Sequence, residues 1–88
     1  MTGTFGGALE TRGVPASDGR LRSSTVGDIE SDGGTLVIRR IHVNYHLSTD
    51  EDVNHSVIDR VMEMHARGCP VYRSLHPQIE ITVSLDLD

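Results

Sequence analysis

The sequence predicts an α+β fold in which an antiparallel-rich sheet of about three strands packs on one long helix. Residues 35–47 and 79–87 alternate apolar and polar side chains with the period of a β-strand. Residues 50–67 instead repeat apolar side chains at the helical spacing of three to four residues. The chain has 88 residues and no internal repeat, so we expect residues 1–88 to form a single small domain.

Residues 1–13 are expected to form the end of a helix. The side chains that share one side at helical spacing are Met1, Phe5, Ala8, Leu9 and Arg12. The glycines in this segment each cost about 1 kcal/mol relative to alanine, so the helix needs other backbone packed closely against it. Gly13 and Pro15 supply a helix stop after Arg12. A disordered start is the alternative, because disorder is common at chain termini.

Residues 20–47 are expected to form two strands. The first is weak because its alternating residues are mostly small, whereas the Asp-Gly pair within residues 31–34 is a clear hairpin signal. In the second strand, Leu36 and Ile38 have the opposite parity to the apolar residues of 41–47. A β-bulge near Arg39 and Arg40 restores one apolar face. Alternatively, both faces are covered there, as at a subunit contact. We expect the two arginines to be solvated, with an anion site as the alternative.

Residues 50–67 are expected to form the long helix. Ser48 and Glu51 have the spacing of a capping box. The expected buried stripe comprises Val53, Val57, Ile58, Val61, Met62 and His65. The last strand, residues 79–87, alternates without a break, which indicates one face on the core and one in water. A three-stranded sheet covered by a single helix leaves its second face and its edges open, and self-association is the simplest remedy.

Composition excludes several classes of function. The net charge of −5 argues against a nucleic-acid partner, because phosphate binding needs a basic face. No apolar run approaches the roughly 20 residues of a membrane span, and the start does not resemble a signal peptide. A single cysteine cannot form an intrachain disulfide, so we expect a reducing, cytoplasmic setting. No motif indicates a bound cofactor.

The single cysteine, Cys69, lies at a junction between two helices. Gly68 is suited to stop the first helix, and Pro70 is suited to begin a second over residues 70–75. We therefore expect Cys69 at an N-cap, where unpaired N–H groups and the helix dipole favour the thiolate. The thiolate is the form that attacks peroxides and disulfides. The alternative role for a free cysteine is that of a small buried hydrophobe.

Two residues that follow Cys69 are further candidate site residues. Tyr72 and Arg73 follow on the short helix and can line a substrate or thiol pocket, although the spacing of Tyr72 to Leu75 also suits packing. We expect no metal site on His65 and Cys69. The break at the glycine between them spoils the helical geometry, and no second close pair exists.

Several segments in order resemble the OsmC/Ohr family of thiol peroxidases. Residues 33–43 look like the family's second-half strand. Residues 69–75, followed by 79–82, look like the segment with its second cysteine and last strand. The match runs with continuous spacing from about Ala8 to Leu87. The resemblance implies the C-terminal half of an OsmC-like fold, N-terminally truncated, with the end of the family's central helix at the start of this chain.

The resemblance also implies a function. Proteins of this family reduce organic hydroperoxides with two cysteines. The first attacks the peroxide and becomes a sulfenic acid, the second condenses with it to a disulfide, and an external thiol restores both. By this resemblance Cys69 is the second, resolving cysteine. The family's attacking cysteine, and the arginine and glutamate that activate it, match no position here, and residues 1–5 stand where the residues after that cysteine would be.

Two functional hypotheses follow. The first is a homodimeric hydroperoxide reductase of the OsmC/Ohr type that uses a thiol reductant and lacks the attacking cysteine in this chain. The second is a non-catalytic, self-associating scaffold derived from that family. A third, weaker hypothesis is redox sensing, in which Cys69 forms mixed disulfides with small thiols.

Overall fold

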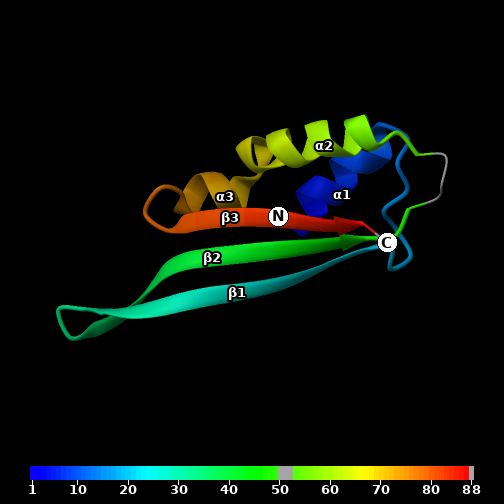
Figure 1. Cartoon of the computed structure of the whole chain (residues 1–88). Coiled ribbons are helices and arrows are strands. Elements are labelled where there is room, and N and C mark those ends of the chain that lie inside the picture. The colour runs from blue at the N-terminus through cyan, green and yellow to red at the C-terminus, as the bar shows by residue number, and fades with distance from the viewer. Residues whose placement is uncertain (50–52, 88) are drawn as a thin grey trace.

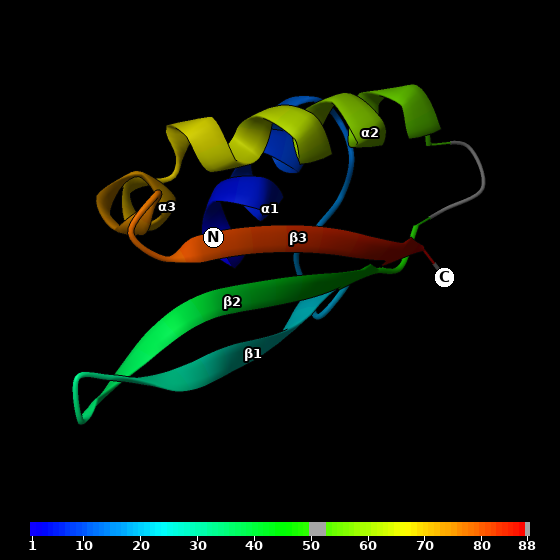
Figure 2. The ribbon, with the colours of Figure 1, turned by 60° about the vertical axis from the view of Figure 1, so that its left-hand side comes forward.

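The computed structural model describes residues 1–49 and 53–87, and within these ranges it has helices on one side of a three-stranded sheet. The elements in chain order are α1 (Thr2–Thr11), β1 (Leu21–Asp32), β2 (Thr35–Leu47), α2 (His55–Met64), the 3-10 helix η1 (His65–Gly68), α3 (Pro70–Leu75) and β3 (Glu80–Leu87). Figures 1 and 2 show α1, α2 and α3 on the same face of the sheet. The predicted α+β layer arrangement is therefore confirmed. No helix in the described part of the chain has the length and apolar character needed to span a bilayer.

The sheet is mixed, which corrects the expectation of an antiparallel-rich sheet. The strand order is β1-β2-β3, with β1 antiparallel to β2 and β3 parallel to β2. Between β2 and β3 the chain passes through α2, η1 and α3, and this crossover returns it to the end of the sheet where β2 began. The expected antiparallel pairing is found only between β1 and β2, which form the hairpin.

The β1–β2 hairpin contains the predicted β-bulge. Asp28 pairs with Arg40, and Ile29 pairs with Ile38, so Arg39 has no partner in the register. The bulge does not bury the apolar residues of the hairpin, because β3 first pairs with β2 at Arg40 and the hairpin extends beyond it (Figure 1). The large apolar side chains left exposed on the hairpin are Val26, Ile29, Leu36 and Ile38.

The predicted long helix over 50–67 is wrong, because two shorter elements take its place. α2 has ten residues and begins after the N-cap Asn54, whose side-chain oxygen accepts a hydrogen bond from the Ser56 N–H at 3.0 Å. It ends at Met64, where the chain tightens into η1. The expected capping box needed Glu51, which lies outside the described residues. The sheet is thus covered by several short helices.

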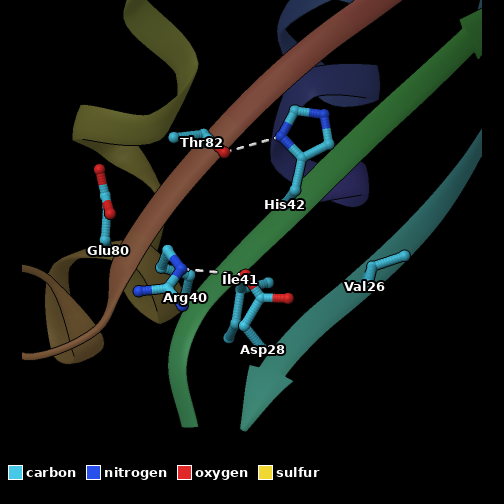
Figure 3. A pocket seen from close by; sticks show the side chains of 7 residues that line it. All are labelled: Val26, Asp28, Arg40, Ile41, His42, Glu80 and Thr82. Carbon is cyan, nitrogen blue, oxygen red and sulfur yellow. Dashed lines mark hydrogen bonds and ion pairs between the residues drawn. The ribbon is translucent and has the colours of Figure 1, made fainter. Parts of the chain in front are cut away.

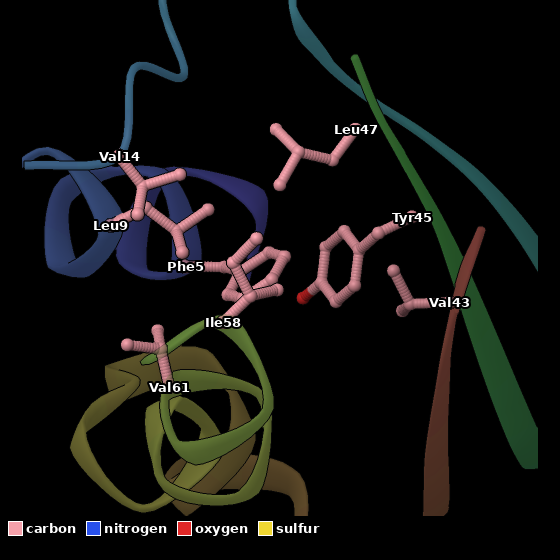
Figure 4. Packing of buried hydrophobic residues seen from close by; sticks show 8 residues of the cluster. All are labelled: Phe5, Leu9, Val14, Val43, Tyr45, Leu47, Ile58 and Val61. Atoms are coloured by element: carbon pink, nitrogen blue, oxygen red, sulfur yellow. The ribbon is translucent and has the colours of Figure 1, made fainter. Parts of the chain in front are cut away.

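The hydrophobic core lies between the sheet and α1 and α2. Its buried members are Phe5, Leu9, Val14, Val43, Tyr45, Leu47, Ile58 and Val61 (Figure 4). α1 is an ordered helix with Phe5 and Leu9 fully buried, and Gly13, with φ of 80°, follows its end as predicted. The expected close backbone packing against the glycines of α1 is not found, because an added Cβ at Gly6 would meet only side chains, that of Leu21 at 3.2 Å, and one at Gly3 or Gly7 would meet nothing within 4 Å.

Candidate functional site

Cys69 lies between η1 and α3 and is the N-cap residue of α3, as the sequence predicts. Its backbone is extended, with φ of −89° and ψ of 120°, and Pro70 follows at the first helical position. The cysteine is only 1% exposed. The sulfur is therefore buried, as expected of a cysteine that only fills space, and it also lies at a helix start, as expected of a reactive thiolate.

Groups from two distant parts of the chain lower the pKa of the Cys69 thiol. The N–H groups of Tyr72 and Val71 belong to α3, whereas the Thr4 hydroxyl belongs to the first turn of α1. Burial raises the pKa of the Cys69 thiol, but hydrogen bonding by these groups and the positive charge of the N-terminus together lower it by more, so the pKa lies below its usual value. The site favours the thiolate relative to a free cysteine.

A buried aromatic group lies within electrostatic range of this sulfur. It consists of Phe5, Tyr45 and His65, whose ring centroids are 4.6, 4.9 and 5.4 Å apart. Burial raises the pKa of Tyr45 to about 12, and negative charge on Cys69 contributes. The tyrosine hydroxyl is therefore protonated at physiological pH and can donate a hydrogen bond.

His65 accepts that hydrogen bond. The Tyr45 hydroxyl lies 3.0 Å from Nε2 of His65, and the other ring nitrogen, Nδ1, lies 3.0 Å from the Met62 carbonyl oxygen and 3.3 Å from that of Val61. Nδ1 faces only acceptors, so it carries the proton and Nε2 accepts from Tyr45. Burial lowers the pKa of His65, which is consistent with a neutral ring. Both ring nitrogens are thus used within the core, and neither is directed to a metal shared with Cys69.

Tyr72 and Arg73 line a surface hollow on α3. The Tyr72 ring stacks on His76, with ring centroids 4.8 Å apart and planes 13° apart. Arg67 completes the lining, and the hollow has a volume of about 440 Å³. Neither Arg67 nor Arg73 forms an ion pair with another residue of ranges 1–49 and 53–87. Within the described ranges, the hollow therefore presents two arginines without an acidic partner, in a chain of net charge −5.

Arg39 and Arg40 do not form an anion site. Nε of Arg40 lies 2.9 Å from an Asp28 carboxylate oxygen, and its Nη2 lies 2.8 Å from a Glu30 oxygen. Arg39 reaches Glu30 at 3.5 Å and Asp32 at 3.3 Å. Figure 3 shows Arg40 facing Asp28 across a shallow hollow of the sheet. Carboxylates on β1 already neutralise both guanidinium groups, and the expectation of an exposed surface pair is confirmed.

Sequence reasoning missed two contacts of this site. The spacing of residues does not connect Thr4 with Cys69, or the Tyr45 hydroxyl with His65. The helical and strand periods placed Tyr45 and His65 on core-facing positions, which is correct. Their mutual hydrogen bond depends on how β2 packs against η1, and local patterns do not contain that information.

A small α+β domain with a buried, thiolate-favouring cysteine at a helix start defines a candidate thiol protein. The family model described as OsmC-like protein matches residues 1–84, and the chain therefore belongs to the OsmC-like family. No curated protein matches the sequence.

Solved structures with this fold include an OsmC-like protein from Mycoplasma pneumoniae, with a TM-score of 0.75 and 16% identity. The match covers 97% of this chain and 60% of that chain. A hypothetical protein from Aquifex aeolicus VF5 has a TM-score of 0.72 and 13% identity, with 99% of this chain and 67% of that chain covered. The organic hydroperoxide resistance protein OhrB of Bacillus subtilis has a TM-score of 0.65 and 14% identity, with 97% and 62% covered. The chain thus spans roughly three fifths to two thirds of the length of these structures.

Proposed function

We propose that this chain takes part in thiol-dependent reduction of organic hydroperoxides, with Cys69 as the resolving thiol. The observation that carries the proposal is the buried position of Cys69 at the N-cap of α3, with the pKa of its thiol lowered toward the reactive thiolate. Family membership and the likeness to an organic hydroperoxide resistance protein support it. The alternative is a scaffold in which Cys69 only fills space.

The proposed cycle has three chemical steps. A first thiolate attacks a peroxide oxygen, the O–O bond breaks, and a sulfenic acid forms while the leaving alkoxide takes a proton to become the alcohol. The Cys69 thiolate then attacks the sulfenic sulfur; the S–S bond forms and hydroxide leaves, taking a proton to become water. An external dithiol reduces the disulfide. Cys69 is the only cysteine of the sequence, so the first thiol comes from outside these 88 residues.

Access to the sulfur requires movement of α3. This helix has six residues and no buried side chain of its own, whereas the neighbouring Cys69 is buried. Segments that bury few apolar contacts open at low free-energy cost. Local opening of α3 therefore exposes Cys69 without disturbing the core.

Cumene hydroperoxide and glutathione together are expected to convert Cys69 into a mixed disulfide that dithiothreitol reduces. The lowered pKa of the Cys69 thiol makes its sulfur the reacting atom. Mass spectrometry measures one added glutathione per chain, and hydroperoxide loss in the same samples should exceed that in Cys69→Ser. An unmodified wild-type chain that consumes no more hydroperoxide than the variant, with a stable dimer by light scattering, would favour the scaffold.

We also propose that the hollow around Tyr72 and Arg73 receives the thiol reductant. Cys69 is the N-cap of α3, and Tyr72 in the first turn of the same helix lines the hollow, so the two features adjoin. The positive charges of Arg67 and Arg73 favour a thiol compound that bears carboxylates.

Arg73→Ala is expected to slow the reaction of Cys69 with glutathione disulfide about two- to fivefold, because exposed ion pairs contribute about 0.2–1 kcal/mol. The rate with cystamine, which is cationic and has no carboxylate, should not fall. Arg22→Ala is the matched control, because Arg22 lies at the start of β1 and is not part of the hollow. Equal slowing with both disulfides, or by both variants, would contradict a carboxylate-binding role.

Self-association as a homodimer is the third part of the proposal. The exposed apolar side chains of the β1–β2 hairpin and the open edges of β1 and β3 both favour burial against another chain. The cytoplasmic setting expected from the single cysteine stays a prediction.

A further inference from the structure

We propose that a hydrogen-bonded row of side chains couples His42 to His46, and that this row accommodates one added proton but not two. The row lies on the face of β2 and β3 that points away from the helices, because its residues on β2 alternate with residues buried in the core (Figure 1). Its members are Thr82, His42, Ser84, Asn44, His46 and Asp86. The coupling is independent of the peroxide chemistry proposed above, because Cys69 lies among the helices on the other face.

His42 is held at both ring nitrogens. Its Nδ1 lies 2.7 Å from the Thr82 hydroxyl, a contact between β2 and β3 that Figure 3 shows, and its Nε2 lies 2.9 Å from the Ser84 hydroxyl. The Ser84 hydroxyl also lies 2.7 Å from Oδ1 of Asn44, which can only accept. Ser84 therefore donates its single proton to Asn44. Nε2 of the neutral His42 ring then donates to Ser84, and Nδ1 accepts from Thr82.

Asp86 sets the direction of this row. One of its carboxylate oxygens lies 3.2 Å from Nδ2 of Asn44, and turning the Asn44 amide round would place two acceptors together. Nδ2 of Asn44 also lies 3.2 Å from Nε2 of His46, which therefore accepts. The proton of the neutral His46 ring is then on Nδ1, which lies 3.6 Å from the same Asp86 oxygen.

A single added proton fits the row at either ring. On His42 it binds Nδ1, and Thr82 only has to turn its hydroxyl in order to accept from that nitrogen. On His46 it binds Nε2, opposite the donor Nδ2 of Asn44. The Asn44 amide then turns round, Ser84 accepts from it and donates to Nε2 of His42, and Nδ1 of His42 carries the proton of that ring. One charged ring is thus compatible with every link between the two histidines.

Two added protons do not fit. Both Nε2 atoms would then be donors, and the Ser84 hydroxyl and the Asn44 amide between them leave one link with a donor at each end. Asn44, Ser84 and His46 are half-buried, so water replaces the lost link only in part. The first proton therefore weakens binding of the second, and the two rings titrate as a pair.

The fixed charges around the rings do not account for such a coupling. The charged residues nearest to the two rings are Arg22 on β1 and Asp86 on β3 at His46, and Asp28 on β1, Arg40 on β2 and Glu80 on β3 at His42. Carboxylates and guanidinium groups keep their charge between about pH 6 and 8. Strand positions 42 and 46 are about 13 Å apart, whereas salt screens charges over about 8 Å at physiological ionic strength. Direct repulsion between the rings is therefore weak and falls with salt, but the hydrogen-bonded row does not depend on salt.

The tautomers of the neutral rings provide the first test. At about pH 8, long-range proton–nitrogen NMR spectra should show His42 protonated at Nε2 and His46 protonated at Nδ1. A free histidine ring favours the Nε2–H form, so His46 is the diagnostic ring. The variants His42→Gln and His46→Gln assign the two signals. A His46 ring protonated at Nε2 would overturn the proposal.

The second test is a titration of both rings from about pH 8 to about pH 5 in about 0.5 M salt. In the wild type we expect each ring to respond in two steps, one for its own proton and one for that of the other ring. The first proton should weaken binding of the second about three- to tenfold, which is the size of one hydrogen bond. A single independent step for each ring would contradict the coupling.

Ser84→Ala removes the link between the rings and should leave each ring with one step. Asn44→Leu removes the next link and should give the same result, and native amide spectra of each variant show that β3 still pairs with β2. Thr82→Val is the matched control, because it removes a hydroxyl at the end of the row and leaves the links between the rings intact. Two steps that persist in both folded link variants, or that vanish in Thr82→Val, would overturn the proposal.

Discussion

Replacing Phe5 by alanine is expected to lower the free energy of unfolding by about 3–5 kcal/mol. Phe5 is fully buried and packs against Tyr45 and His65, so truncation removes burial and leaves a cavity between α1 and β2. Small domains have a total stability of about 5–15 kcal/mol, so much of it would be lost. Urea unfolding followed by circular dichroism measures the change.

The control for this prediction is Leu36→Ala. Leu36 is also a large apolar residue, but it is 76% exposed at the end of the hairpin. Its truncation should change the free energy of unfolding by no more than about 0.5 kcal/mol. A comparable loss in both variants would mean that the core does not centre on α1.

The second large effect is expected from Tyr45→Phe. This change keeps the ring but removes the hydroxyl that donates to Nε2 of His65, so a buried acceptor is left without its partner. The expected cost is about 1–3 kcal/mol. Tyr72→Phe is the matched control, because that tyrosine lies on the surface of α3 and should lose no more than about 0.5 kcal/mol. Equal losses would contradict the buried hydrogen bond.

A pH dependence accompanies the same pair. Burial lowers the pKa of His65 below its unfolded value of about 6.5, so the unfolded chain binds more protons in acid. The contribution of neutral His65 to stability is therefore fully present above about pH 6.5 and is lost as the pH falls through the folded pKa. His65→Gln should flatten the dependence of the unfolding free energy on pH in this window. An unchanged slope would show that His65 is already accessible to protons.

Sequence patterns determined those features of the protein that depend on neighbouring residues. The Asp-Gly turn, the bulge beside Arg40 and the N-cap position of Cys69 all follow from local backbone preferences, and all are observed. The strand and helix periods also placed Tyr45 and His65 toward the core. The prediction of one long helix was wrong. The apolar spacing extends beyond α2 at both ends, whereas α2 itself begins only after Asn54 and gives way to the 3-10 helix η1 after Met64.

Only the tertiary structure decided how β3 pairs and what surrounds the sulfur. An alternating strand fits either edge of a sheet in either direction, and the crossover through the helices selects the parallel pairing with β2. The Tyr45 hydroxyl meets His65 because β2 packs against η1, and Thr4 on α1 lowers the pKa of Cys69 although the two are far apart in the chain. Such interactions join residues that are far apart in the chain, so they form only when the helices and the sheet pack together, and local sequence patterns do not predict them.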